Sequence, residues 1–202
     1  MTIAENIAKV REQIDQAARD AGRDPGEITL VGASKMNDAA ACREAVAAGI
    51  DALGENRVQE MVQKLEQHAY DGAPLHFIGH LQRNKVKQVV GHVALIQSVG
   101  SLELLDEIEK VAAARGLVQD ILLEVNIGRE AAKSGFAPEK VLPAAEAALE
   151  RTHVRVRGLM TIPPADAQRD ANFRYFQEVQ ALYVDMNQKL FHNELEYLSM
   201  GM

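Results

Sequence analysis

Residues 28–56 read ITLVGASKMNDAAACREAVAAGIDALGEN, and they contain one complete strand–helix–strand unit. The unit begins with an apolar run at 28–34, which has the length and composition of a buried strand. An alanine-rich segment at 38–49 is helical in character, and a second short strand follows at 51–56. This order is typical of two parallel strands that are joined by a right-handed crossover helix.

The same alternation covers the rest of the chain. An amphipathic helix is predicted over 2–21, and Thr2 with Glu5 three residues later forms a capping box at its start. Further strands are predicted at 75–80, 93–99, 120–126, 154–160 and 196–200, and further helices at 58–68, from about 83, at 102–114, at 138–149 and after 163–164. Strands that alternate with helices indicate an α/β fold with a parallel sheet.

Two α/β architectures fit this alternation, an open doubly wound sheet and a closed (β/α) barrel. The turn after the first strand, residues 32–37, reads GASKMN and does not match the glycine-rich G-x-G-x-x-G turn of doubly wound nucleotide-binding sheets. Instead, the apolar runs end on polar or reactive side chains: Lys35, Asn56, His80, Ser98, Asn126, Thr161 and Ser199. In a barrel these positions share the C-terminal face, where active sites are built. We therefore predict a (β/α) TIM-type barrel, preceded by an N-terminal helix, as one domain over 1–202.

The amino-acid composition argues against several classes of protein. The chain has 202 residues, of which 47% are hydrophobic and 25% charged, as in an ordinary globular protein. A net charge of -7 argues against a nucleic-acid binder, since neutralising phosphates requires a basic face. No apolar run approaches the roughly 18 residues that a membrane span needs. The single cysteine, Cys42, cannot form an internal disulfide, so we expect a cytoplasmic protein.

Lys35 is the strongest candidate for chemistry, because it directly follows the first apolar run and should be poorly solvated there. Desolvation lowers the pKa of a lysine, and the neutral amine adds to an aldehyde to form a Schiff base. The other candidates are weaker. His76 and His80 would lie about 13 Å apart along a strand, too far for one zinc ion. Cys42 is predicted to be a small buried residue. The basic cluster at 83–87 fits a phosphate or partner site and a solvated helix start equally well.

Six motifs in chain order resemble those of one known family. They are GASK at 32–35, GENRVQE at 54–60, HFIGHLQRNK at 76–85, KSGF at 133–136 and RGLM at 157–160, and LSMGM at 198–202 completes the set. The chain resembles the pyridoxal phosphate homeostasis proteins, whose fold is similar to the barrel domain of alanine racemase. The resemblance implies a cytoplasmic barrel that holds pyridoxal 5'-phosphate (PLP) without efficient turnover. It also implies PLP-dependent apo-enzymes as partners, and we expect a monomer.

The resemblance assigns roles to particular residues. It implies that Lys35 forms the Schiff base with PLP, that Asn56 lies on the ring side of the cofactor, and that Ser199, Gly201 and Met202 begin the phosphate loop. His80 belongs only to the periphery of that site. Members of the family continue with a further helix and an eighth strand, so we expect seven strands here, an intact lysine end and an incomplete phosphate end. Two alternatives stay open: a racemase-like enzyme that uses the same lysine, and a barrel without cofactor that acts through protein interactions.

Overall fold

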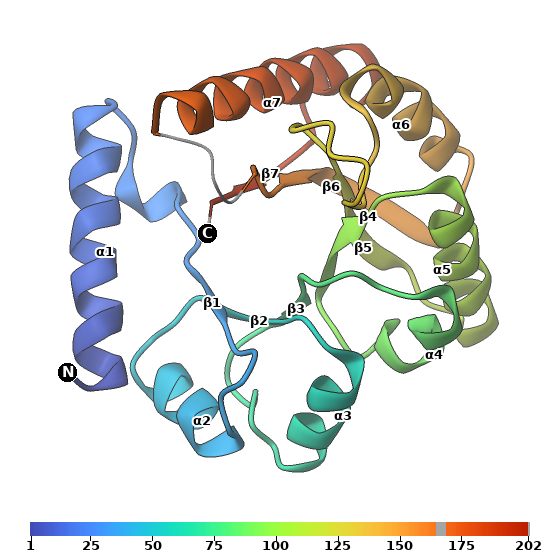
Figure 1. Ribbon diagram of the computed structural model, residues 1–202. Helices are drawn as coiled ribbons and strands as arrows, with labels where there is room; N and C mark the ends of the chain where they lie inside the picture. The colour runs from blue at the N-terminus through green and yellow to red at the C-terminus, as the bar shows by residue number, and fades with distance from the viewer. Residues whose placement is uncertain (165–168, 202) are drawn as a thin grey trace. The chain divides into compact units, whose positions relative to one another are not determined.

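The computed structural model describes residues 1–164 and 169–201. The chain divides into two compact units, Met1–His76 and Phe77–Met202. Figure 1 labels the helices and strands along the chain. Among the described residues, no helix combines the length and the apolar character that crossing a membrane requires.

The first unit alternates helices and strands. Its elements are α1 (Ile3–Asp20), the 3-10 turn η1 (Pro25–Glu27), β1 (Val31–Ala33), α2 (Ala39–Ala47), β2 (Ala52–Glu55) and α3 (Val58–Glu66), and β3 (Leu75–Phe77) begins at its end. β1 and β2 are parallel, with Val31 opposite Ala52 and Ala33 opposite Gly54. Since both strands run in the same direction, the residues that follow them come to the same edge of the sheet.

Local interactions explain where the first helix begins. The predicted capping box of α1 is confirmed: Thr2 Oγ1 accepts the N–H of Glu5 at 3.1 Å, and the Glu5 carboxylate accepts the N–H of Thr2 at 2.8 Å. Arg11, in the middle of α1, donates to the carbonyl of Ile28 and forms an ion pair with Asp51. The Asp51 carboxylate also accepts the N–H of Leu30. These contacts fasten α1 to the segment that leads into β1.

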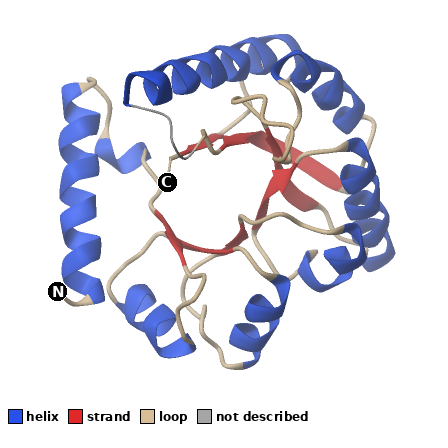
Figure 2. Ribbon diagram, viewed as in Figure 1, coloured by secondary structure: helices blue, strands red, loops and turns tan. Residues whose placement is uncertain are grey.

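The second unit contains the remaining elements. They are η2 (Arg83–Lys85), α4 (Val86–Val89), β4 (Leu95–Val99), α5 (Leu102–Arg115), β5 (Gln119–Glu124), η3 (Pro138–Lys140), α6 (Val141–Leu149), β6 (Val154–Thr161), α7 (Arg169–Leu190) and β7 (Tyr197–Met200). The pairs β4–β5, β5–β6 and β6–β7 are all parallel. Figure 2 shows the helices of this unit along one face of its strands. The core of this unit includes fully buried side chains of β5 and α5, such as Ile121, Leu123 and Ile108.

The α/β class and the count of seven strands in the described residues agree with the sequence prediction. The strands are shorter than predicted at several ends. In the first run, only Val31–Ala33 pairs with β2, because Pro25–Glu27 forms a 3-10 turn and the chain reaches the sheet after Leu30. The helix predicted from about residue 83 is a 3-10 turn followed by the four residues of α4.

Candidate functional site

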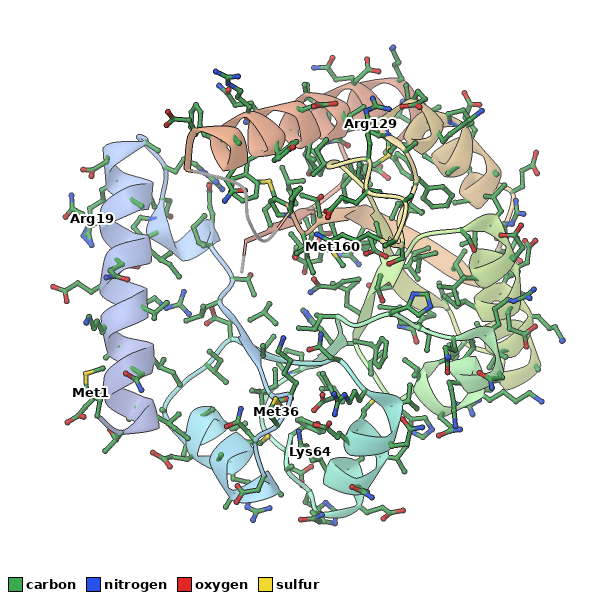
Figure 3. The ribbon with its side chains drawn as sticks, viewed as in Figure 1. Met1, Arg19, Met36, Lys64, Arg129 and Met160 are labelled. Atoms are coloured by element: carbon green, nitrogen blue, oxygen red, sulfur yellow. The ribbon has the colours of Figure 1, made fainter. Side chains whose placement is uncertain are left out.

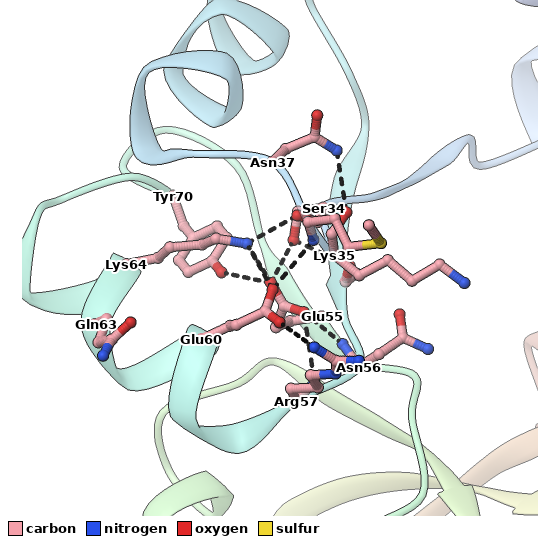
Figure 4. Close-up of polar contacts among 12 residues, drawn as sticks. Ser34, Lys35, Asn37, Glu55, Asn56, Arg57, Glu60, Gln63, Lys64 and Tyr70 are labelled. Atoms are coloured by element: carbon pink, nitrogen blue, oxygen red, sulfur yellow. Dashed lines mark hydrogen bonds and ion pairs between the residues drawn. The ribbon is translucent and has the colours of Figure 1, made fainter.

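Lys35 and Asn56 lie together at one edge of the first unit. Lys35 is the second residue after β1, and Asn56 is the first residue after β2, the parallel neighbour of β1. Figure 4 shows that both side chains extend toward the same side, away from Lys64 and Tyr70. The structure therefore brings together the two predicted site residues of this unit.

The surroundings of Lys35 differ from the sequence prediction. Its side chain is exposed, so the expectation of a poorly solvated amine is wrong for this structure. The reason is local, since β1 ends at Ala33 and Lys35 lies in the turn beyond the sheet. Among the described residues, no hydrogen bond or ion pair of the Lys35 ammonium group is found. An amine in this position is accessible to a molecule that arrives from solvent.

Asn56 is half-buried, and its amide oxygen has no partner. Its Oδ1 is shielded from solvent and accepts no hydrogen bond among the described residues. A buried acceptor without a donor costs about 1–3 kcal/mol. The backbone of Asn56 is held in place, because its N–H donates to Glu55 Oε1 at 2.7 Å. Asn56 thus presents an unpartnered hydrogen-bond acceptor on the same side as the exposed amine of Lys35.

A buried ion pair lies behind these two residues. The Lys64 ammonium group is 2.6 Å from Glu55 Oε2, and the two side chains are 7% and 0% exposed. Ser34 and Tyr70 also donate to the same carboxylate oxygen, at 3.0 and 3.4 Å. Burial raises the pKa of the Tyr70 phenol, so Tyr70 keeps its proton and acts as a donor to Glu55. Figure 3 locates Lys64 in the whole chain, and Figure 4 shows its contacts.

The Lys64–Glu55 pair was not predicted from the sequence. The pattern that reveals it is the spacing of Val58, Met61 and Lys64, which are three residues apart and are all buried in α3. A lysine on the buried face of a helix requires a carboxylate partner. Glu55, the last residue of a strand whose other residues are apolar, is the fully buried carboxylate that pairs with it.

Ser199 and Gly201 lie in the second unit, at the end of β7. Ser199 is half-buried and donates its hydroxyl hydrogen to Gln97 Oε1 at 2.7 Å. Gly201 is exposed and has φ +106, a left-handed backbone conformation that other residues rarely adopt. Met202, the third residue predicted for the phosphate loop, lies outside the described residues.

Three other strand-end side chains have structural roles. Ser98 donates to the carbonyl of Gly79 at 2.6 Å, and Thr161 donates to that of Val125 at 2.8 Å. Asn126 closes a loop, because its amide donates to the carbonyl of Glu130 and accepts the N–H of the same residue. His80 is exposed at the end of the third predicted strand. Within the described ranges, no group of three or more metal-ligating side chains is found.

Known proteins share the fold of this chain. A family model of the alanine racemase N-terminal domain matches residues 3–202. The alanine racemase of Clostridium difficile 630 superimposes with a TM-score of 0.67 at 15% identity, covering 87% of this chain and 51% of that enzyme. At that identity the likeness concerns the fold alone, and it confirms the predicted class, that of the racemase barrel domain.

Two closer proteins identify the family. A protein of Aquifex aeolicus (strain VF5), named pyridoxal phosphate homeostasis protein, is 41% identical over 202 residues, which are 100% of this chain and 88% of the relative. PipY of Synechococcus elongatus PCC7942, solved with PLP bound, has a TM-score of 0.82 at 28% identity and is matched over 100% of this chain and 88% of its own. The chain therefore belongs to the family of pyridoxal phosphate homeostasis proteins, as its motifs predicted.

Proposed function

We propose that this protein binds PLP and takes part in intracellular PLP homeostasis, holding the cofactor as a Schiff base on Lys35. The observation that carries the proposal is the pairing of an exposed lysine amine with the unpartnered Oδ1 of Asn56 at the ends of two neighbouring parallel strands. PLP supplies an aldehyde, which condenses with a lysine amine to form a C=N bond with release of water. The name of the Aquifex relative and the PLP bound to PipY support this ligand.

The residues of the first unit fit such a group. The Lys35 amine has no partner among the described residues to compete with the aldehyde, and its exposure leaves it accessible to a molecule in solution. Asn56 Oδ1 needs a donor, which a polar group on the bound molecule would provide. We propose that Asn56 orients the bound ring in this way.

For the phosphate we propose Ser199, Gly201 and Met202. The proposal is supported by the place of these residues at the end of the last strand and by the left-handed backbone of Gly201. Backbone N–H groups in such conformations form concave anion sites. The Ser199 hydroxyl donates to Gln97 and therefore offers only its lone pairs in this structure, so its contribution would come from the backbone.

We propose a carrier rather than an enzyme. The proposal is supported by the name of the Aquifex aeolicus relative, pyridoxal phosphate homeostasis protein. We further propose that 1–202 acts as one PLP-binding domain, since the family model matches across both units. The cytoplasm is proposed as its compartment, supported by the free, buried thiol of Cys42. The monomeric state and PLP-dependent apo-enzymes as acceptors stay predictions.

Borohydride trapping tests the proposal. The purified protein is mixed with PLP, reduced, and analysed by intact mass and peptide mapping. We expect one reduced PLP per chain on the peptide that contains Lys35, no adduct in Lys35→Ala, and an unchanged adduct in Lys189→Ala, whose exposed lysine on α7 is the matched control. An adduct that persists in Lys35→Ala, or that is spread over many lysines, would refute Lys35 as the binding residue. Repeated turnover of D- or L-alanine by the loaded protein would favour the racemase-like alternative.

A further inference from the structure

Side chains of α3 hold the backbone on both sides of Lys35. The Lys64 ammonium group donates to the carbonyl of Ser34 at 2.8 Å, which fixes the peptide group before Lys35. The Glu60 carboxylate accepts the N–H of Met36 at 3.1 Å, which fixes the peptide group after it. Accepting this N–H is the main reason that the pKa of Glu60 lies below its usual value. The two α3 residues are four positions apart and therefore lie on one side of the helix.

The same cluster also holds Asn56. Glu55 Oε1 accepts the N–H of Asn56 at 2.7 Å, while its Oε2 binds Lys64 at 2.6 Å. Lys64 in turn lies 3.7 Å from Glu60 Oε2. One connected set of charged side chains, Glu55, Glu60 and Lys64, therefore contacts the backbone at both proposed PLP residues of this unit. We call this set the α3 anchor.

The Lys35 side chain itself has no partner in the described part of the chain. The position of its amine is therefore set only by the backbone from which the side chain extends. Met36 has φ +63, an uncommon conformation for a residue with a side chain, and the bond to Glu60 stabilises it there. Figure 4 shows the Lys64 ammonium group and the Lys35 side chain on opposite sides of Ser34. Lys64 thus binds the Ser34 carbonyl from the side opposite to the Lys35 side chain. The side on which Lys35 extends is left free for a ligand.

We propose that Glu55, Glu60 and Lys64 are positioning residues, which place the Lys35 amine and the Asn56 amide relative to each other for Schiff-base formation. The inference rests on the proposed function of Lys35. Reacting groups have to be held close to the productive geometry, and a misplacement of about 1 Å costs about a hundredfold in rate. The α3 anchor supplies this placement without touching the ligand.

The test compares Glu60→Ala with Glu60→Gln. Alanine removes the acceptor of the Met36 N–H, whereas glutamine keeps an oxygen in its place. The probe is pyridoxal, an aldehyde without phosphate, which isolates the lysine end of the site from the phosphate end. We measure the rate of borohydride-trapped adduct at Lys35 and the hydrogen exchange of the Met36 and Asn56 amides. Glu107→Ala is the matched control, because Glu107 pairs with Lys110 on the surface of α5.

We expect trapping to slow by about 10- to 100-fold in Glu60→Ala, with faster exchange at Met36, and to recover largely in Glu60→Gln. Folded Lys64→Met should also show slower trapping and faster hydrogen exchange at the Met36 and Asn56 amides. Leu105→Ala, which truncates a fully buried side chain in the second unit, controls for general destabilisation. Wild-type trapping and exchange in folded Glu60→Ala would overturn the positioning role and leave the proposed function intact. Absence of any Lys35 adduct in the wild-type protein would overturn both.

Discussion

Replacing Lys64 by methionine is the sharpest perturbation of stability that the structure offers. Methionine preserves the length and the apolar stem of the side chain but removes the ammonium group that lies 2.6 Å from Glu55 Oε2. Glu55 is completely buried, and without Lys64 it keeps only neutral donors: the hydroxyls of Ser34 and Tyr70 and two backbone N–H groups. A buried charge that loses its counter-charge destabilises the folded state by about 3–5 kcal/mol.

For a chain of this size, each kcal/mol lowers Tm by about 2–4 °C, so Lys64→Met should melt roughly 6–20 °C below the wild-type protein. The double variant Glu55→Gln/Lys64→Met removes both charges and should recover about 0.5–3 kcal/mol relative to the sum of the single changes. Lys110→Met, which removes an ammonium group that is 72% exposed, should change the free energy of unfolding by less than about 0.5 kcal/mol.

Urea unfolding is the assay, followed by circular dichroism and by tyrosine fluorescence, since the chain has no tryptophan. Coincident curves from the two probes are needed before a single free energy is extracted. A loss below about 1 kcal/mol in Lys64→Met would refute the reasoning, because it would mean that the carboxylate is solvated or neutral in the folded protein. Additive effects in the double variant would refute the direct pairing.

Three further predictions concern other parts of the chain. Thr2→Ala removes half of the capping box of α1 and should cost about 0.5–2 kcal/mol in urea unfolding, whereas an unchanged midpoint would show that the first turn frays in solution. Burial lowers the pKa of His76 from 6.5 to about 4. Because the unfolded chain then binds the additional proton, the free energy of unfolding should fall as pH decreases from about 6.5 to 4, by up to about 1.4 kcal/mol per pH unit, and His76→Gln should flatten that profile. Burial also raises the pKa of the Cys42 thiol, so iodoacetamide should modify native protein far more slowly than urea-unfolded protein, and equal rates would contradict the buried position.

The order and type of the elements were predictable from the sequence, because apolar runs of strand length alternate with longer helical segments throughout. Strand ends were less predictable, since they depend on pairing: Ile28–Leu30 is as apolar as Val31–Ala33, yet only the latter pairs with β2. Hydrophobicity indicates which residues are buried. The last hydrogen-bonded residue of a strand depends instead on the register of the neighbouring strand.

The positions of Lys35 and Asn56 after neighbouring strands could be predicted from the sequence, whereas their roles toward PLP stay predictions. The solvation of Lys35 could not be predicted, because it depends on how far β1 extends, which no local pattern gives. The α3 anchor was missed because Lys64 reads as an ordinary charged residue of a surface helix. Only the spacing from Val58 and Met61 places it on the buried face. Ser98, Thr161 and Asn126, which were not assigned to the site, show that polar residues at strand ends also serve to bond the backbone.

The hydrogen bond between Ser199 and Gln97 has a consequence for how the second unit folds. It joins residues that are 102 positions apart, one on β7 and the other on β4. Closing so long a loop is entropically expensive, and contacts of large sequence separation form slowly. During synthesis β4, β5 and β6 can pair as each one emerges, but the contact from β7 has to wait until Ser199 has also left the ribosome. The end of the site that we propose for phosphate therefore forms after these three strands, and a nascent chain would acquire its lysine end first.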